Sequence, residues 1–397
     1  MKEDFFKYQA QTGPHPLAME ISHAEGSYIY DNSGKAFLDF VAGVSANSLG
    51  HGHPTVTNAI KEQLDAYTHV MVYGEYILKP AVELSKLLAT HLPAPLETTY
   101  LTNSGTEATE GALKLAKKVT GRSEIIAAEK AYHGNTQGAM SVMGFEERKS
   151  AFRPLIPGTR YIRFNSEEDL LKITANTAAV ILETIQGGAG FVAPENDYLK
   201  KVKARCEETG ALLILDEIQP GFGRTGRLFG FEHYDIVPDI VIMGKGMGGG
   251  MPVGAFTASR AMMDNLKEGP KLGHITTFGG HPVIAAACLA TLKELTQTTL
   301  IPDTLRKETL FRELLVHPLI KEIRGKGLML ALLFENEEIT NHLILRSLDK
   351  GLILFWLLFE KKAARITPPL TISEEEIRSG CAIILEVLDE YQGLNVN

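Results

Sequence analysis

The chain has 397 residues, of which 44% are hydrophobic and 22% charged, with a formal net charge of −8 at pH 7. This length exceeds what one hydrophobic core usually serves, so we expect one large and one smaller domain. The negative charge and the scattered basic residues argue against a nucleic-acid-binding surface.

The N-terminal residues Met1–Pro16 contain charges and prolines but no apolar core, so we expect no secretory signal. The longest strongly apolar run, Leu352–Phe359, is too short to cross a bilayer as a helix. Cys206, Cys288 and Cys381 offer neither a disulfide framework nor a metal-ligand spacing. We therefore expect a soluble, cytoplasmic protein with no metal site and no membrane contact.

The first predicted elements are a hairpin and a long helical segment. Ser27–Tyr30 and Phe37–Phe40 flank a turn that has a glycine, Gly34, where a positive φ is needed. The segment from His53 to about Leu92 reads as helical and stops at a Pro-rich sequence.

Between about residues 98 and 256, short apolar strands alternate with helical patterns. The expected strands are Thr99–Thr102, Glu124–Ala128, Ala178–Leu182, Ala211–Leu215 and Ile240–Met243, and the expected helices are Glu107–Lys118 and Leu199–Glu208. This alternation predicts an α/β fold with mostly parallel strands that are buried on both faces by flanking helices.

The tail from about residue 291 begins with helix-like sequence, alternates again through Gly327–Phe334 and ends with a helix near Glu374–Tyr391. We assign residues 53–290 to the large domain. Residues 1–52 and 291–397 are expected to build the smaller α+β domain together.

Polar residues follow each predicted strand of the large domain. They are Asn103–Glu107, Glu129–Gly134, Glu183–Gly187, Asp216–Gln219 and Gly244–Lys245. Because ligands bind outside the carboxyl ends of the strands in open α/β sheets, these five endings predict one site.

Ser104-Gly-Thr-Glu107 before an amphipathic run is a capping box, in which Glu107 turns back to the Ser104 backbone. A purely structural interpretation of this pattern is a well-capped helix. A helix N-terminus also attracts anions, and Gly105 would let a phosphate approach the backbone, with the Thr106 hydroxyl as a further donor.

Asp216 ends a strongly apolar run, where a carboxylate is costly unless it is paired. Its partner is either a structural cation or the protonated ring nitrogen of a cofactor. Lys245 is either solvated in a turn or buried, and burial would favour its neutral amine, which forms Schiff bases.

Residues 244–252, GKGMGGGMP, contain the dinucleotide pattern G-x-G-x-x-G. That pattern must open a helix, whereas the adjoining residues Met251–Ala258 resemble another strand. A nucleotide-binding oxidoreductase is therefore disfavoured.

Four stretches resemble class III pyridoxal-phosphate aminotransferases, a family that includes the ornithine, acetylornithine and 4-aminobutyrate enzymes. They are Asn103–Ala112, Leu215–Gly226, Gly244–Pro252 and Thr276–Pro282, in family order. The resemblance extends from Leu38 to Leu370 and implies a fold type I homodimer with active sites at the subunit interface.

The resemblance also implies residue roles around the cofactor, pyridoxal 5′-phosphate. Lys245 would hold it as a Schiff base, and Asp216 would pair with the pyridine nitrogen, which keeps the ring an electron sink. The other implied cofactor contacts are Ser104, Gly105 and Thr106 at the phosphate, Thr277 at the partner subunit's phosphate, Tyr132 stacked on the ring, Gln219 near the ring hydroxyl, and Ile218.

Two further roles concern the substrate side of the site, and a third concerns the cofactor loop. Glu183 would belong to the substrate-side network, and Arg365 would bind a substrate α-carboxylate with two parallel hydrogen bonds. His133 would shape the cofactor loop under Tyr132 and would not act as the base. The implied reaction moves an amino group from an amino acid, ornithine and acetylornithine among the candidates, to a 2-oxo acid such as 2-oxoglutarate, in two half-reactions.

Two positions depart from the family pattern. The ornithine and acetylornithine members usually have an arginine where this chain has Asn135. The ω-amino-acid members usually have a glutamate, which neutralises the carboxylate-binding arginine, where this chain has Gly188. We therefore expect Arg365 to stay available for an α-carboxylate, so ornithine is not assured as the substrate. A racemase or another non-transaminating enzyme of this fold remains an alternative, because the cofactor residues would be the same.

Overall fold

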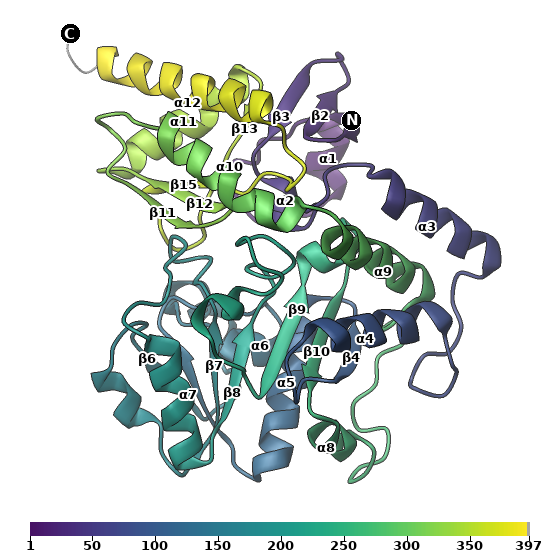
Figure 1. Ribbon diagram of the computed structural model, residues 1–397. Coiled ribbons are helices and arrows are strands. Elements are labelled where there is room, and N and C mark those ends of the chain that lie inside the picture. Colours follow the sequence, from purple (N-terminus) through teal and green to yellow (C-terminus); the bar gives the residue numbers. More distant parts are fainter. Residues whose placement is uncertain (395–397) are drawn as a thin grey trace.

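The largest sheet has seven strands from residues 98–258 of a computed structural model that describes residues 1–394 (Figure 1). The strands stand in the order β4-β10-β9-β8-β7-β5-β6. Their bounds are β4 (Thr98–Thr102), β5 (Glu124–Ala128), β6 (Thr159–Ile162), β7 (Thr177–Glu183), β8 (Leu212–Asp216), β9 (Ile240–Gly244) and β10 (Gly254–Ala258). Strands pair in parallel from β9 through to β6, and β10 is antiparallel to both neighbours. The expected α/β class with a mostly parallel sheet is confirmed.

The sheet is buried on both faces, as its continuous apolar strands predict. Every residue of β7 is buried, with Val180 and Leu182 in one hydrophobic cluster and Ala179 and Ile181 in another. Successive side chains of a strand point to opposite faces, so two separate layers of helices are required. The helix α7 (Tyr198–Thr209) contributes to the first cluster, and α5 (Gly105–Thr120) contributes to the second.

The expected helix over residues 53–92 is wrong in one respect, because two helices form there. They are α3 (Pro54–Ala66) and α4 (Lys79–His91), and both begin with a proline in the first turn. Tyr67 is fully extended and Gly74 has φ +75°, so residues 67–78 leave the helical conformation. Valine, threonine and tyrosine in this segment lose χ1 freedom in a helix, which explains the break. The strand β6 was missed because it is a short edge strand with Arg160 exposed.

The two ends of the chain build two four-stranded sheets, drawn above the large sheet in Figure 1 and here called the terminal region. One contains β1 (Ile21–Glu25), β2 (Tyr28–Asp31), β3 (Ala36–Asp39) and β13 (Leu352–Ile353), and the other contains β11 (Glu322–Lys326), β12 (Met329–Leu333), β15 (Ala363–Ile366) and β14 (Phe355–Trp356). The predicted hairpin is present, with Gly34 at φ +84°. Parallel pairing of β3 with β13 ties the N-terminal hairpin to the C-terminal tail.

The remaining helices are α1 (Lys2–Tyr8), α2 (Ala42–Ser45), α6 (Gln137–Ser141), α8 (Arg260–Met263), α9 (Pro282–Gln297), α10 (Leu300–Leu314), α11 (Glu337–Asp349) and α12 (Glu374–Leu394). The helix α9 packs against α3 and α4 and runs across the predicted domain boundary at residues 290/291. The division of the chain into domains stays a prediction.

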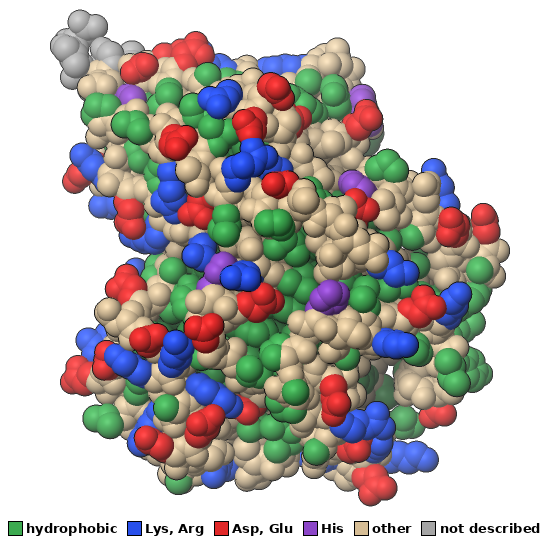
Figure 2. All heavy atoms as spheres, viewed as in Figure 1, with side chains coloured by type: hydrophobic (Ala, Val, Ile, Leu, Met, Phe, Trp, Pro, Cys, Tyr) green, Lys and Arg blue, Asp and Glu red, His purple; other side chains and the backbone are tan. Residues whose placement is uncertain are grey.

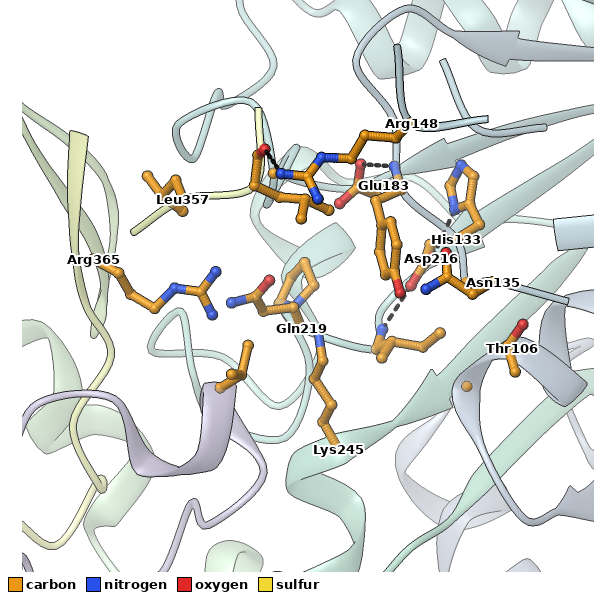
Figure 3. A pocket seen from close by; sticks show the side chains of 18 of the residues that line it. Thr106, His133, Asn135, Arg148, Glu183, Asp216, Gln219, Lys245, Leu357 and Arg365 are labelled. Atoms are coloured by element: carbon orange, nitrogen blue, oxygen red, sulfur yellow. Dashed lines mark hydrogen bonds and ion pairs between the residues drawn. The ribbon is translucent and has the colours of Figure 1, made fainter. Parts of the chain in front are cut away.

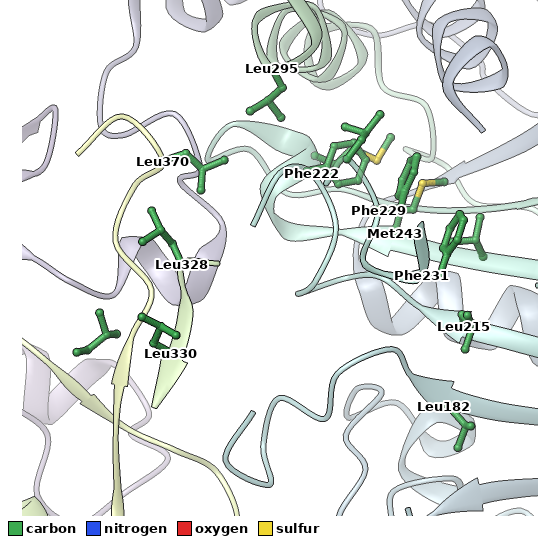
Figure 4. Packing of buried hydrophobic residues seen from close by; sticks show 14 of the residues in the cluster. Leu182, Leu215, Phe222, Phe229, Phe231, Met243, Leu295, Leu328, Leu330 and Leu370 are labelled. Atoms are coloured by element: carbon green, nitrogen blue, oxygen red, sulfur yellow. The ribbon is translucent and has the colours of Figure 1, made fainter. Parts of the chain in front are cut away.

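One hydrophobic cluster joins the large sheet to the terminal region (Figure 4). It runs from Leu215 and Met243 on the sheet, through a group of phenylalanines, to Leu370 and Leu330. Because a shared core resists separation, the terminal region holds a fixed place over the carboxyl ends of the strands.

Acidic and basic side chains are interspersed over the face drawn in Figure 2. Across residues 1–394, the helices include none long and apolar enough to cross a membrane. In the same part of the chain, no cluster of histidine, cysteine or carboxylate side chains could hold a metal ion. Cys206, Cys288 and Cys381 are free and buried.

Candidate active site

A cavity of about 640 Å³ lies where the carboxyl ends of the large sheet face the terminal region (Figure 3). All of the predicted site residues line it except Ser104 and Thr277. The residues from the sheet side are Gly105, Thr106, Tyr132, His133, Gly134, Asn135, Arg148, Glu183, Gly188, Asp216, Ile218, Gln219, Pro220 and Lys245. Those from the terminal region are Val44, Phe355, Trp356, Leu357, Leu358 and Arg365.

Asp216, the last residue of β8, is held by two hydrogen bonds. His133 Nδ1 lies 2.7 Å from its Oδ2, and the Ile218 N–H donates to its Oδ1 at 2.9 Å. An ionised carboxylate only accepts, so Nδ1 carries the hydrogen toward it. Both side chains are almost fully buried, and His133 Nε2 has no partner within residues 1–394. His133 therefore fixes the Asp216 carboxylate, a contact that sequence reasoning missed.

Glu183, the last residue of β7, joins two loops at the edge of the cavity. Its carboxylate accepts the Tyr132 N–H at 3.1 Å and the Gly187 N–H at 2.9 Å. Burial raises the pKa of Glu183 to about 7, with a further rise from the charge of Asp216 and an opposing effect from His133. Near neutral pH this carboxyl is therefore present in both protonation states while it holds the Tyr132 backbone in place.

Lys245 follows β9 directly and begins a single 3₁₀ turn, Lys245–Gly248. Its φ of +42° is uncommon for a residue with a side chain and indicates local strain. Burial lowers the pKa of the amine to about 8; Arg365 lowers it further, and Asp216 and Glu183 oppose the shift. The amine is thus much more available in its neutral form than that of an exposed lysine.

The glycines around Lys245 make room for close packing. A Cβ on Gly246 would lie 2.4 Å from Ser48 Oγ, and one on Gly244 would contact the Gly105 Cα at 3.5 Å. The loop then continues into β10 and opens no α-helix. It therefore lacks the element that a dinucleotide-binding pattern requires.

The N-terminus of α5 forms another wall. Ser104 caps the helix, its Oγ accepting the Glu107 N–H at 3.4 Å. The predicted return contact of Glu107 is wrong by one residue, because its carboxylate accepts the N–H of Asn103 at 2.7 Å. Ser104 has the extended backbone that is typical of an N-cap residue. Ser104 thus acts here as a cap and does not line the cavity.

The loop after β5 packs directly on this helix start. Thr106 Oγ1 lies 2.8 Å from Thr136 Oγ1, and a Cβ on Gly134 would overlap the Thr106 side chain at 2.2 Å. A Cβ on Gly105 would similarly meet Ile218 at 2.7 Å. Glycine at both positions leaves the first N–H groups of α5 accessible from the cavity, as binding of a phosphate requires.

Arg365 on β15 enters the cavity from the terminal side and points toward Gln219 (Figure 3). It is only 6% exposed, yet its Nε and Nη1 have no hydrogen-bond partner within residues 1–394. Burial lowers the pKa of its guanidinium to about 10. A buried cation with unused donors is costly, so this arrangement favours an anionic ligand.

Several cavity residues were not predicted. Trp356, expected in the core, is half-buried at the cavity and donates from Nε1 to Asn341 Oδ1 at 2.7 Å. Phe355, Leu357 and Leu358 join it in an apolar wall. The sequence signal was the apolar run itself, but only the pairing of β14 with β15 shows that this run faces the site.

The two departures from the family pattern, Asn135 and Gly188, both line the cavity. A Cβ on Gly188 would lie 2.8 Å from the Phe359 ring, and the Phe359 N–H donates to the Gly188 carbonyl at 2.8 Å. The space beside Gly188 is therefore filled by an aromatic ring. Thr277 is exposed and lies outside the cavity of its own chain.

Solved structures with this architecture include aminotransferases. The ornithine aminotransferase of Toxoplasma gondii superimposes with a TM-score of 0.91 at 30% identity, covering 99% of this chain and 96% of that one. A transaminase from the marine bacterium Virgibacillus has a TM-score of 0.92 at 23% identity, covering 99% of both chains, and supports the fold alone. The fold is thus that of a fold type I pyridoxal-phosphate-dependent transferase.

Residues 8–388 match the sequence model of the family described as Aminotransferase class-III, and the chain belongs to this family. The acetylornithine aminotransferase of Caldanaerobacter subterraneus subsp. tengcongensis is 39% identical over 380 residues, which are 93% of this chain and 94% of that protein. The acetylornithine aminotransferase of Bacillus subtilis is 36% identical over 383 residues, 95% of this chain and 97% of that protein. This chain is accordingly a pyridoxal-phosphate-dependent transaminase that acts on amino acids and 2-oxo acids.

Proposed function

We propose that Lys245 is the amine to which pyridoxal phosphate attaches and that Asp216 pairs with the protonated ring nitrogen. The observation that carries this proposal is the position of both groups in one cavity at the ends of adjacent strands. The Asp216 carboxylate is fixed by His133 and Ile218 and has capacity for one more donor. The lowered pKa of Lys245 suits an amine that must attack a carbonyl carbon.

The remaining cofactor contacts come from the same walls. Gly105 and Thr106 offer N–H groups and a hydroxyl to a phosphate at the start of α5. Ile218 and Tyr132 supply the surfaces that flank the ring, and Gln219 lies near the ring hydroxyl. These residues fit the cofactor because glycine keeps the helix start open, while the buried carboxylate is available to a cationic ring.

When bound, pyridoxal phosphate supplies an electron sink for the charge that develops at the substrate Cα. The chain would supply the proton transfer: Lys245 Nζ, released when the amine of the donor takes its place, would accept the proton of the substrate Cα and donate it again. Asp216, held by His133, would present its carboxylate to the ring nitrogen. Glu183 fixes the Tyr132 backbone, so the aromatic ring stays over the reacting group.

Arg365 holds the α-carboxylate of an α-amino acid donor in this proposal. Gly188 has no side chain that could neutralise the guanidinium. The Nε and Nη1 donors of Arg365 are unused within residues 1–394. A competing proposal is an ω-amino donor such as acetylornithine or ornithine, which the names of the relatives favour. The acceptor is 2-oxoglutarate or a similar 2-oxo acid.

The test is a screen of amino donors with 2-oxoglutarate and pyruvate as acceptors. We expect simple α-amino acids to be better donors than acetylornithine, ornithine, lysine and 4-aminobutyrate. A strong preference for acetylornithine would reject the α-amino assignment. A colourless protein that added pyridoxal phosphate cannot restore would reject the cofactor roles of Lys245 and Asp216.

We further propose a cytoplasmic homodimer with shared active sites. Exposed apolar side chains gather on the segments near residues 71–82 and 272–278, which include Tyr76, Ile77 and Phe278. These segments adjoin, because the Phe278 ring lies 4.8 Å from that of His69. Such a patch is typical of an interface, and Thr277 within it would reach the phosphate of the partner's site. Free buried cysteines suit the reducing cytoplasm.

Mixed dimers test the sharing of sites. A dimer of one Lys245→Ala subunit and one Thr277→Ala subunit contains one site with both native residues only if Thr277 serves the partner. We expect this mixture to bind the cofactor more tightly at one site than either parent dimer. No gain over the Thr277→Ala dimer, or a monomer by light scattering, would contradict the proposal.

A further inference from the structure

A second arginine enters the cavity from the sheet side. Arg148 ends a short 3₁₀ turn, Glu146–Arg148, and lines the same cavity as Arg365. Its Nη2 donates to the Leu358 carbonyl at 3.1 Å, and its guanidinium lies 6.0 Å from the Phe359 ring centroid. In Figure 3 the guanidinium groups of Arg148 and Arg365 approach the cavity from different walls.

The charge of Arg148 is not neutralised by a neighbouring carboxylate. Glu146, two residues earlier, pairs with Arg153 at 2.8 Å, and Glu183 accepts two backbone N–H groups. Arg148 makes no ion pair within residues 1–394, and its Nε and Nη1 donate to no group there. The charge of Arg148 acts at the cavity, because it lowers the pKa of the Tyr132 phenol against the rise that burial causes.

The wall between the two arginines is apolar. It consists of Trp356, which ends β14, and the next two residues, Leu357 and Leu358. The carbonyl of Leu358 is the group that accepts the hydrogen bond from Arg148. Two cations on separate walls with an apolar surface between them complement a ligand that has two carboxylates on a short apolar chain.

We propose that Arg148 is a specificity-determining residue that binds the distal carboxylate of a dicarboxylic substrate, glutamate or its 2-oxo acid, while Arg365 binds the α-carboxylate. The inference rests on the proposed role of Arg365 and adds the substrate class. Because Arg148 is anchored by one nitrogen only, its other nitrogens remain available to the ligand. Asn135, which also lines the cavity, can donate a further hydrogen bond from its side-chain amide.

The kinetic test compares 2-oxoglutarate with pyruvate, which lacks the distal carboxylate, in Arg148→Met, Arg148→Lys and wild type. In Arg148→Met we expect KM for 2-oxoglutarate to rise about tenfold, as for loss of one charge-assisted contact, with little change in kcat. KM for pyruvate should change less than about twofold, and Arg148→Lys should recover part of the loss. The matched control is Arg153→Met, because Arg153 is exposed like Arg148 but pairs with Glu146 and lies outside this cavity.

The alternative is that Arg148 only holds the Leu358 carbonyl in place. In that case KM for both acceptors would rise together, and this outcome overturns the proposal. So would an unchanged KM for 2-oxoglutarate in Arg148→Met.

Equilibrium binding gives a readout that needs no turnover. Glutarate and pentanoate have the same chain length, and only glutarate has two carboxylates. By calorimetry on the holoenzyme, we expect wild type to bind glutarate more tightly than pentanoate and Arg148→Met to lose about tenfold for glutarate alone. Equal affinities in wild type would reject the distal site. Loss of transaminase activity with every donor would reject the proposed function instead, and the glutarate comparison would still report on Arg148.

Discussion

The sheet-side and terminal-side walls of the cavity differ in how their charged side chains are paired. On the sheet side, Asp216 and Glu183 are buried and hydrogen-bonded to His133 and to backbone N–H groups. On the terminal side, Arg365 has unused donors, and its neighbours Trp356 and Leu357 are apolar. A fixed network suits reaction steps that every substrate shares, whereas unpaired cations and apolar surface suit the choice of substrate. Reaction chemistry is thus assigned to the hydrogen-bonded network of the sheet side. Selection is assigned to the two unpaired arginines, Arg365 on the terminal side and Arg148 on the sheet side.

The strongest test of this division is Lys245→Ala. Removal of the amine should lower the turnover rate by on the order of 10³-fold or more, because both the covalent link and the proton carrier are lost. Glutarate should still bind, since both arginines remain. The measurements are single-turnover rates, borohydride fixation of the cofactor and calorimetry.

Lys130→Ala is the matched control, because Lys130 is exposed and also has a positive φ. Thermal unfolding of the cofactor-free Lys245→Ala protein should be no lower than that of wild type, since the cost of burying the amine is removed. Loss of glutarate binding in the same variant would break the separation of the two walls.

Arg365→Met tests the opposite wall. We expect kcat/KM for the amino donor to fall by about 10–100-fold, mainly through KM, as a charged contact to the α-carboxylate is lost. The visible absorption of the bound cofactor should not change. Replacement of a buried, unpaired guanidinium by an apolar side chain should leave the melting temperature equal or higher. A variant that loses the visible absorption of the cofactor, or its stability, would place Arg365 in the cofactor network. The two walls would then not be separate in function.

Much of the sheet-side wall could be predicted, because local sequence carries it. Asp216 and Lys245 stand directly after continuous apolar strands, and the carboxyl ends of parallel strands meet at one edge. The contact of His133 with Asp216 was not predictable in the same way. Their strands, β5 and β8, are separated in the sheet by β7, so the contact depends on the strand order.

The terminal wall, and Arg148 on the sheet side, were mostly missed for a related reason. Phe355–Leu358 form part of an apolar run that resembles core, and β14 is only two residues long. Arg148 sits in a 3₁₀ turn with no periodic pattern. Such residues gain their position from long-range packing, which no local spacing encodes. Arg365 was found only through its family resemblance.

A smaller effect should appear in the pH dependence of stability at Glu183. Its pKa of about 7 in the folded protein exceeds the usual 4.5. Between these values the folded state keeps a proton that the unfolded chain releases, so the contribution of Glu183 to the free energy of unfolding falls as pH rises. Relative to wild type, Glu183→Gln should therefore be more stable at about pH 8 than at about pH 5.

The measurement is urea unfolding across this pH range, with the exposed Glu129→Gln as control. The amide of glutamine offers one acceptor fewer to the two N–H groups, which adds an offset that does not vary with pH. Only the slope is diagnostic. A parallel pair of curves would mean that Glu183 is ionised in the folded protein throughout, and the sheet-side wall would then carry one more fixed negative charge.

The mildest change is Gly188→Ala, at the point where the two walls touch. The new Cβ would lie 2.8 Å from the Phe359 ring, so the ring must move away from its stacking partner Phe145, 4.6 Å distant. We expect a loss of about 1 kcal/mol in the free energy of unfolding and a rise of a few-fold in KM, because Leu358 moves with the ring. Gly13→Ala is the control, since a Cβ there meets nothing within 4 Å.

The double variant Gly188→Ala/Phe359→Leu should recover part of both losses, since the smaller side chain gives the methyl group room. If KM rises without any loss of stability and the double variant recovers nothing, Gly188 acts on the ligand directly. It then belongs with the residues that select the substrate.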